Sequence, residues 1–308
     1  MSRVLRIGTR KSKLALVQTE TVIAELKKSN PDLRCEVVHI STTGDKFMGD
    51  LNKVGGKGVF VKEIEEALLN NTIDIAVHSM KDVPYNMTDG LVISSMLERD
   101  DIRDVAICKT ATSFIDLDEG SKVGTSSLRR ASQIKSAFPY LNIVPIRGNI
   151  HTRLQKMEDG EVSAIVLAKA GIDRMDWADK ITVVFEPDML CPAIGQGAIG
   201  MQCRADDELI KEDLAKINHK DTFTCVSVER IVIRMLAGTC QTPIGGFCEV
   251  TKGGNLRMIA LVATPDGSKI IRSRHKLPYE DAEVLGEVVA KDLLNQGALE
   301  MLAPTTAA

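Results

Sequence analysis

Short apolar runs rich in β-branched residues alternate along the chain with longer segments in which apolar positions recur every three to four residues. The short runs predict strands at residues 4–7, 37–40 and 73–77. Between the first two, Ser12 is suited to cap a helix that Pro31 must end. A second helix is expected over residues 60–69. Strands and helices in alternation predict an α/β domain.

The same alternation begins again after residue 101 and changes near residue 221. In the second stretch we expect strands over residues 105–107, 143–146 and 164–167 and helices over residues 128–138 and 150–157. This pattern predicts a second α/β domain. Beyond it we expect a helix from residue 221 to 236, strands over residues 246–250, 256–264 and 269–277, and a helix over residues 280–295. That order predicts a small α+β module.

Overall composition argues against several classes of function. The chain has 308 residues, with 39 Lys and Arg against 42 Asp and Glu, so its formal net charge is −3. This balance does not suggest a nucleic-acid tail or a membrane-surface protein. Aromatic residues make up only 4%, which argues against RNA binding through stacked bases. No apolar run approaches the roughly 20 residues of a membrane helix. We expect a cytoplasmic monomer with no nucleic-acid or membrane partner.

The seven cysteines form no C-x-x-C pair and cannot all be paired within the chain, so we expect free thiols in a reducing compartment. The five histidines are scattered, and their spacing predicts neither a metal site nor a His-based triad. Cys240 lies in a loop after a helix that we expect Gly238 to end, where an unpaired thiol can be a nucleophile. We expect the other six to be small buried side chains, although spacing alone does not separate Cys240 from Cys248.

Charge distribution is more informative than net charge. Residues 121–153 contain no Asp or Glu and six cations: Lys122, Arg129, Arg130, Lys135, Arg147 and Arg153. Within this stretch, residues 124–127 and 147–149 each join a strand to the start of a helix, where open α/β sheets bind anions. A solvated basic face is the alternative, which we favour for the two lysines. For the two arginines directly after the Gly-Thr-Ser-Ser turn we favour ligand binding.

The first domain repeats this arrangement of cations at strand ends. Residues 9–12 link its first strand to its first helix, and residues 78–82 follow another strand. Between them lies a Gly-rich loop that is not a Walker A loop, because Gly58 follows Lys57. If both domains present their basic ends to each other, the crevice would bind a large polyanion. The predominance of arginine suits planar carboxylates.

Asp82 differs from its surroundings, since it is a carboxylate among cations. In that setting it could stabilise a cationic intermediate or relay a proton. Alternatively it caps a helix, because Pro84 follows and proline favours the first helical turn. The spacing leaves the two roles equally open. We expect His78 and His151 to be polar packing or strand-end residues rather than bases.

Several long motifs together resemble the porphobilinogen deaminase (hydroxymethylbilane synthase) family. They are RIGTRKSKLAL, KVGGKGVFVKE, DIAVHSMKDVP, LERDDIRD, VGTSSLRR, IRGNIHTRL, CPAIGQG and GTCQTPIGG, which follow the family's order between residues 5 and 246. The resemblance implies a transferase of tetrapyrrole and heme biosynthesis. Such an enzyme condenses four porphobilinogen molecules head to tail, with loss of ammonia, on a covalently bound dipyrromethane cofactor, and gives linear hydroxymethylbilane.

The resemblance also implies a three-domain organisation. The expected domains are a discontinuous α/β domain of residues 1–97 and 197–217, an α/β domain of residues 98–196 with a basic cleft face, and an α+β domain of residues 218–308 that carries the cofactor cysteine. The first two would resemble periplasmic solute-binding proteins and enclose a cleft. The two chain crossings between them would make a plausible hinge.

Individual residues acquire roles only through this resemblance. Asp82 matches the catalytic aspartate, which would stabilise the azafulvenium-like cation left by loss of ammonia, and Cys240 matches the thioether anchor of dipyrromethane. The further cofactor-binding positions are Lys81, Thr125, Ser126, Ser127, Arg129, Arg130, Arg147 and Gly148. The substrate-binding positions are Arg10, Ser12, Arg147, Arg153, Arg174, Lys53, Lys57 and Phe60. Thr239 departs from the family, which commonly has glycine there, and a positive φ at Thr239 would be strained.

An alternative function of a different class is a two-lobed anion-binding receptor or sensor without catalysis. It accounts equally well for a basic crevice. It does not account for a carboxylate at Asp82 in that crevice. An assay with porphobilinogen separates the two functions.

Overall fold

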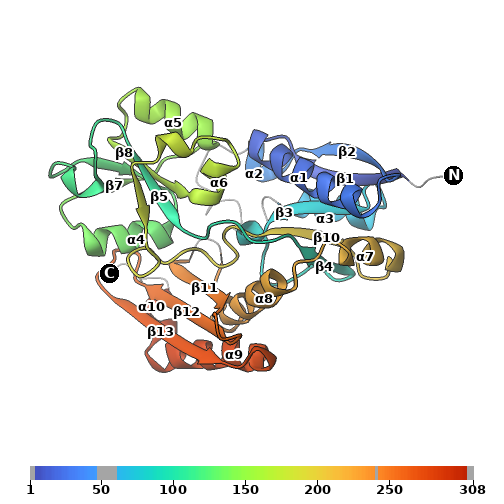
Figure 1. The fold of residues 1–308 in the computed structure, drawn as a ribbon. Helices are drawn as coiled ribbons and strands as arrows, with labels where there is room; N and C mark the ends of the chain where they lie inside the picture. The colour runs from blue at the N-terminus through green and yellow to red at the C-terminus, as the bar shows by residue number, and fades with distance from the viewer. Residues whose placement is uncertain (1–3, 47–60, 240–241, 304–308) are drawn as a thin grey trace. The chain divides into compact units, whose positions relative to one another are not determined.

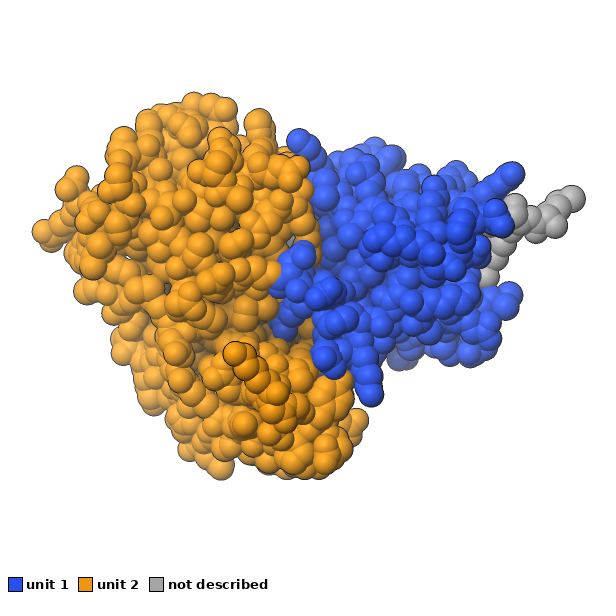
Figure 2. Space-filling model, in the orientation of Figure 1, with its two compact units in different colours: residues 1–100, 197–224 blue, residues 101–196, 225–308 orange. Residues whose placement is uncertain are grey.

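A computed structural model describes residues 4–46, 61–239 and 242–303 (Figure 1). The chain divides into two compact units, coloured separately in Figure 2: residues 1–100 with 197–224, and residues 101–196 with 225–308. It therefore leaves unit 1 near residue 100 and returns to it near residue 197. The finer division into three domains, with boundaries at residues 97, 197 and 217, stays a prediction.

Unit 1 is built on a mixed sheet with the strand order β2-β1-β3-β10-β4. The strands are β1 (Val4–Arg10), β2 (Arg34–Ile40), β3 (Ile75–Ser79), β4 (Leu91–Met96) and β10 (Ile199–Arg204). Strand β1 runs parallel to β2 and β3, whereas β10 is antiparallel to β3 and β4. The carboxyl ends of β1 and β3 therefore lie at the same edge of the sheet, where α/β folds bind ligands.

Helix α1 (Lys13–Ser29) begins and ends where the sequence predicts. The Ser12 side chain accepts a hydrogen bond from the backbone N–H of Ala15 at 3.3 Å, and Asn30 is the C-cap. The buried face of α1 joins the sheet in one core, which includes Leu5, Ile7, Val22, Leu26 and Ile75. The other helices of unit 1 are α2 (Thr43–Lys46), α3 (Lys62–Leu69), α7 (Glu208–Ala215) and the first turn of α8 (Lys220–Met235).

Unit 2 contains a second mixed sheet, with the order β7-β6-β8-β5-β9. The strands are β5 (Asp104–Cys108), β6 (Lys122–Gly124), β7 (Asn142–Val144), β8 (Ala164–Ala168) and β9 (Val183–Phe185), and the helices are α4 (Leu128–Ala137), α5 (Ile150–Glu158) and α6 (Lys169–Asp173). Phe114 packs edge-to-face on Phe138 and Phe185, with 5.1 Å between ring centroids in each pair. These rings belong to the core on one side of the sheet.

Each of these two sheets receives an antiparallel strand from a segment next to a chain crossing. Strand β10 begins just after Gly197, and β5 begins just after the chain has entered unit 2 at Asp101. Strand β5 is antiparallel to β8 and β9, as β10 is to β3 and β4. The crossing segments are thus anchored by strands inserted inside the sheets.

The rest of unit 2 forms a small antiparallel sheet, β11-β12-β13, with β11 (Ile244–Val250), β12 (Leu256–Ala263) and β13 (Ile270–Leu277). Helices α9 (Ala282–Asn295) and α10 (Ala298–Leu302) contact this sheet, and Figure 1 shows α9 lying along it. One core joins the sheet to α8 and α9 through Val228, Val232, Met258, Val262, Leu285 and Val289.

These elements confirm the predicted fold class of two α/β sheets and a small α+β module. The predicted strands and helices are present, with bounds shifted by a few residues. Strands β4, β6, β9 and β10 were not predicted, nor were helices α2, α6, α7 and α10. Because β6 and β9 have only three residues each, they are too short for alternation to reveal a pattern.

Candidate functional site

Four of the predicted site residues of unit 1 follow its parallel strands β1 and β3. Arg10 is the last residue of β1 and Ser12 caps α1, while Lys81 and Asp82 follow β3 in a short 3-10 turn (Met80–Asp82). Ile7 pairs with Ile75 and Gly8 with Ala76 in the parallel register of β1 and β3. The site residues that follow β1 and those that follow β3 therefore lie toward the same edge of this sheet.

The turn that carries Asp82 is fixed through its backbone. The N–H of Met80 donates to the carbonyl of Ala198 at 3.0 Å, and the N–H of Val83 donates to the carbonyl of Met80 at 3.2 Å. The Met80 side chain is buried, whereas Asp82 is partly exposed. No helix starts at Asp82 within the described residues, because the 3-10 turn ends there and β4 follows. The alternative that Asp82 is a helix N-cap is therefore wrong.

A hydrogen-bonded chain runs from the strands that support this turn to Glu65 of helix α3. His78 Nε2 is 2.9 Å from Gln202 Oε1, and Gln202 Nε2 donates to Glu65 Oε1 at 2.8 Å. Burial lowers the pKa of His78, and the Gln202 hydrogen bond and the nearby carboxylates only partly oppose this. His78 is thus a neutral packing residue at a strand end, as the sequence predicts. His151 lies instead on the exposed side of α5, near the ring of Trp177.

In unit 2, the predicted turn at residues 124–127 forms the start of α4. Thr125 donates its N–H to Val144 O at 2.9 Å, and the Ser126 hydroxyl donates to Ile146 O at 2.7 Å. Ser127 is the N-cap, because its side chain accepts from the N–H of Arg130. These bonds attach the turn to the neighbouring strand and place the positive end of the α4 dipole at the sheet edge.

The second predicted anion site, at residues 147–149, forms the start of α5 in the same way. Asn149 is the N-cap and accepts from the N–H of Thr152 at 2.9 Å. Gly148 has φ of +110°, a conformation open to glycine and costly for other residues. The Arg153 Nε donates to Gly148 O at 2.8 Å, so the helix holds this turn through its own side chain.

The five predicted site arginines of unit 2 fall into two groups. Arg147, Arg153 and Arg174 are partly exposed, and they follow strands β7 and β8, which both run parallel to β6. Arg129 and Arg130 are only 4% and 6% exposed. Three partly exposed guanidinium groups and two helix N-termini thus lie toward one edge of the sheet, which suits carboxylate or phosphate groups.

The expectation that Arg129 and Arg130 are unopposed is wrong. Both form ion pairs with Asp104, at 2.8 Å for Arg129 Nη1 and 2.7 Å for Arg130 Nη2. Burial alone would raise the pKa of Asp104, but the two guanidinium charges hold it well below its usual range. The sequence of this stretch does not reveal the pair because the partner lies 25 residues earlier, in the motif LERDDIRD.

Other predicted residues lie outside the described part of the chain: Lys53, Lys57, Phe60 and Cys240. On either side of Cys240, Thr242 N–H donates to Thr239 O at 3.0 Å and Thr239 N–H donates to Thr242 Oγ1 at 2.9 Å. The residue in the left-handed region is Ala237, with φ of +48°, rather than Thr239. The strain expected at Thr239 is therefore absent, and Ala237 makes the turn that we assigned to Gly238.

Spacing alone could not distinguish Cys248 from Cys240 as the candidate nucleophile, but the structure shows that Cys248 is buried. Cys248 is 3% exposed, and its N–H donates to Glu229 Oε1 at 2.8 Å. Cys191, Cys203 and Cys225 are also buried. Cys35 and Cys108 are only partly buried, so the expectation of burial is wrong for these two. All six described cysteines are free thiols.

Residues of the α4 start also lie near the segment that follows Cys240. A Cβ added to Gly245 would lie 3.2 Å from Arg129 Cδ and 3.0 Å from the carbonyl oxygens of Cys191 and Pro192. Gly246 N–H donates to Pro192 O at 2.8 Å. Strand β11, which begins four residues after Cys240, is thus packed directly against the chain beside Arg129.

Sequence analysis missed three buried polar residues that support this region. They are Asp104, Gln196 and Glu229, which are all fully buried. Gln196 and Glu229 carry no local signal, because each contacts residues far away in sequence. Asp104 carried a weak local signal, because it is an acidic residue at the start of an apolar run.

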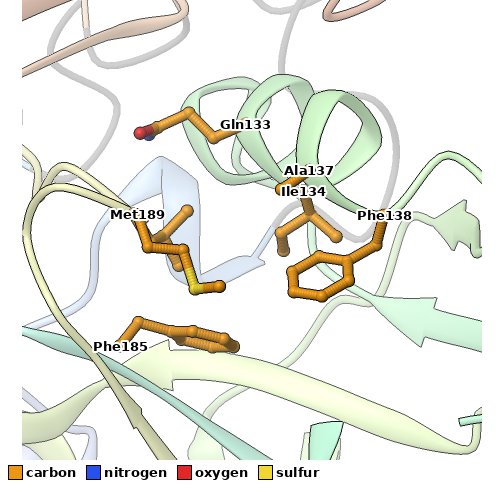
Figure 3. Close-up of a pocket in the computed structure, with 7 residues that line it drawn as sticks. Gln133, Ile134, Ala137, Phe138, Phe185 and Met189 are labelled. Carbon is orange, nitrogen blue, oxygen red and sulfur yellow. The ribbon is translucent and has the colours of Figure 1, made fainter. Parts of the chain in front are cut away.

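A small surface pocket elsewhere in unit 2 has a different character (Figure 3). It is lined by Gln133, Ile134, Ala137, Phe138, Phe185, Met189 and Leu190. No lining residue is ionisable, so the pocket offers no charged group to an anion.

Among the residues that the structure describes, His, Cys, Asp and Glu side chains nowhere gather in a group of three that could hold a metal ion. Within the same ranges, no helix combines the length and apolar character needed to cross a bilayer.

Two protein-family models match the chain. The model described as porphobilinogen deaminase, dipyromethane cofactor binding domain, matches residues 5–212, and the model of the porphobilinogen deaminase C-terminal domain matches residues 223–295. Among curated proteins, the porphobilinogen deaminase of Syntrophobacter fumaroxidans is 46% identical over 301 residues, covering 97% of each chain. That of Halalkalibacterium halodurans is 46% identical over 302 residues, covering 97% of this chain and 96% of the relative.

Among solved structures, the methionine-binding protein MetQ is similar with a TM-score of 0.46 and 14% identity, covering 74% of this chain and 94% of that one. This similarity is too low to support any statement about function.

Proposed function

Because this chain belongs to the porphobilinogen deaminase family, we propose that it condenses four porphobilinogen molecules head to tail, with loss of ammonia, into linear hydroxymethylbilane. The single observation that best supports this function is the set of cationic and hydroxyl groups at one edge of the unit 2 sheet. Two helix N-termini, capped by Ser127 and Asn149, lie there with Arg147 and Arg153. Each porphobilinogen carries two carboxylates, so a growing oligomer needs several such partners.

The residues of unit 2 fit the dipyrromethane cofactor of the family's cofactor-binding domain. Arg129 and Arg130 with Asp104 form a buried cluster of net charge +1 (two guanidinium charges minus one carboxylate), which favours an anion beside it. The residues proposed to hold the cofactor's acid groups are Lys81, Thr125, Ser126, Ser127, Arg129, Arg130, Arg147 and Gly148. Cys240 is proposed as its covalent anchor. When bound, the group supplies the free pyrrole α-carbon that is the nucleophile.

Asp82 is proposed as the catalytic carboxylate. When the C–N bond of porphobilinogen breaks and ammonia leaves, positive charge develops on the substrate's pyrrole and methylene carbon. A carboxylate beside that charge stabilises it while the new C–C bond forms, and can then accept the proton lost from the attacking pyrrole α-carbon. The backbone bonds of the Met80–Asp82 turn hold the group in place, so little reorganisation is needed.

The remaining predicted residues are proposed to bind the substrate. The polar ones would contact its carboxylates: Arg10, Ser12, Arg147, Arg153, Arg174, Lys53 and Lys57. Phe60 would stack beside the cofactor. We also propose that the enzyme works as a monomer in the cytoplasm. The six described free thiols support a reducing compartment, and light scattering of the purified chain tests the oligomeric state.

The alternative of an anion-binding receptor without catalysis makes opposite predictions. If the chain is the enzyme, intact-mass measurement should find the added mass of two pyrrole units on the wild-type chain and on Cys35→Ser, but not on Cys240→Ser. Asp82→Asn should keep the added mass and lose at least about 100-fold in turnover, while Asp89→Asn, an exposed aspartate of unit 1, should match wild type. A wild-type chain with only its sequence mass and no turnover would refute the enzyme.

A further inference from the structure

Asp104 is the first residue of β5 and is fully buried. Its Oδ1 accepts from Arg130 Nε at 3.1 Å and from Arg130 Nη2 at 2.7 Å, and its Oδ2 lies 2.8 Å from Arg129 Nη1. One carboxylate thus contacts both arginines of the α4 start. A buried charge is retained in this way only when its partners are close and well oriented.

The two arginines use their nitrogens differently. Arg130 donates from all three nitrogens to the protein, with Nη1 bonded to Val166 O at 3.1 Å and the other two to Asp104. Arg129 donates through Nη1, to Cys191 O at 2.5 Å, and pairs with Asp104 through the same atom. A guanidinium has five N–H donors, so Arg129 retains its Nε and Nη2 donors for a ligand, while Arg130 is largely committed to the fold.

The surroundings of Arg129 further restrict its position. Gln133 accepts from Cys191 N at 2.8 Å and donates to Cys191 O at 3.1 Å, which fixes the carbonyl that Arg129 also contacts. On the other side, the Cδ of Arg129 is close to Gly245 at the start of β11. The side chain is therefore held between the Cys191 backbone and the strand that follows the cysteine-bearing segment.

Gln196 connects this cluster to the crossing segments of unit 2. Its Nε2 donates to Asp104 Oδ1 at 2.9 Å and to Ile102 O at 2.7 Å. Asp104, in the segment that enters unit 2, therefore receives bonds from Gln196 in the segment that leaves it and from Arg130 in α4.

We propose that Asp104 is a positioning residue that orients Arg129, with Arg130 as a brace, so that the remaining guanidinium nitrogens of Arg129 meet a carboxylate of the dipyrromethane cofactor. This inference rests on the proposed function. It narrows the role proposed above for Arg130: Arg129 binds the ligand, whereas Arg130 mainly holds Asp104. The carboxylate acts through its geometry as well as through its charge.

The test is a double-mutant cycle on cofactor attachment. The full-length chain is prepared without cofactor, porphobilinogen is added, and the rate of gain of the two-pyrrole mass is followed by intact-mass spectrometry. Asp104→Asn and Arg129→Lys should each slow attachment by about 10-fold or more, as expected for loss of a group that orients a ligand contact. The double variant should attach cofactor at a rate within about 2-fold of that of the slower single variant, because both changes remove the same interaction.

The matched control is Asp101→Asn. Asp101 is a partly buried carboxylate in the same crossing segment, paired with Arg103 at 2.7 Å, and it touches neither Arg129 nor Arg130. It should attach cofactor at the wild-type rate. If Asp104 only supports the fold, the losses in the double variant should multiply to about 100-fold, and that result would overturn the proposal, as would attachment by Asp104→Asn at the wild-type rate.

Asp104→Glu covers the case in which Asp104→Asn does not fold. It keeps the charge and displaces the carboxylate by one methylene, so it should fold, judged by its urea unfolding midpoint, and still attach cofactor about 10-fold more slowly. Normal attachment by Asp104→Glu would show that charge alone suffices and would overturn the positioning role. A wild-type chain that gains no mass would instead refute the proposed function, so the two failures are distinguishable.

Discussion

Replacement of Glu229 should destabilise unit 2 by removing two buried hydrogen bonds at once. Glu229 lies on α8 and is fully buried. Its Oε2 accepts from Gly195 N at 2.6 Å and its Oε1 from Cys248 N at 2.8 Å. It therefore ties α8 both to the chain just before the crossing at residue 197 and to strand β11.

In Glu229→Ala both backbone N–H groups lose this acceptor. A buried polar group left unpaired costs about 1–3 kcal/mol, so two of them should lower the free energy of unfolding by about 2–6 kcal/mol. Glu229→Gln keeps one acceptor oxygen but turns an NH₂ group toward the other N–H, so it should lose roughly half as much.

The assay is urea unfolding followed by circular dichroism and by the fluorescence of Trp177, the single tryptophan of the sequence, which lies in unit 2. Glu287→Ala is the control, because Glu287 lies on the surface of α9 and pairs with Lys291. Such a pair contributes about 0–1 kcal/mol. A loss below about 1 kcal/mol in Glu229→Ala, or equal losses for Ala and Gln, would refute the reasoning.

Two further perturbations concern acid stability and a glycine turn. Since the pKa of Asp104 is lowered in the folded state, its stabilisation is present above the unfolded value of about 3.9 and is lost as the pH falls below it. The wild type should therefore lose more stability than Asp104→Asn on acidification through this range, and parallel losses would contradict the pairing. Gly148→Ala should destabilise more than Gly120→Ala in thermal melting: both have positive φ, but only at Gly148 would the new Cβ meet a side chain, Thr152 Cβ at 2.7 Å. The positive φ alone costs about 1–3 kcal/mol, and equal melting temperatures would argue against the clash.

Local patterns predicted those parts of the fold whose interactions are local. Helix α1 is the clearest example, since Ser12 caps it and Pro31 follows its end at Asn30. The starts of α4 and α5 were also predicted, because Ser127 and Asn149 bond to groups three residues away. In each case the hydrogen bond that decides the boundary connects residues within one turn.

Predictions failed where long-range contacts decide. Arg129 and Arg130 were predicted to be cations without an acidic partner, because Asp104 is distant in sequence. The N-cap role considered for Asp82 was wrong, because β4 pairs with β10 and the chain after the turn is drawn into the sheet. The turn after α8 uses Ala237 rather than Gly238.

The sequence by itself determined the alternation of strands and helices, the helix caps, the family, and the residues whose chemistry suits carboxylates, since these depend on side-chain type and short spacing. Only the tertiary structure decided which charges are neutralised. It buried Asp104 between two arginines and brought Gln196 to the same carboxylate across 92 residues. The reason is physical, because an ion pair depends on the distance between two charges in space. Residues of β5, α4 and the second crossing are far apart in sequence and come close together only when the sheet has formed.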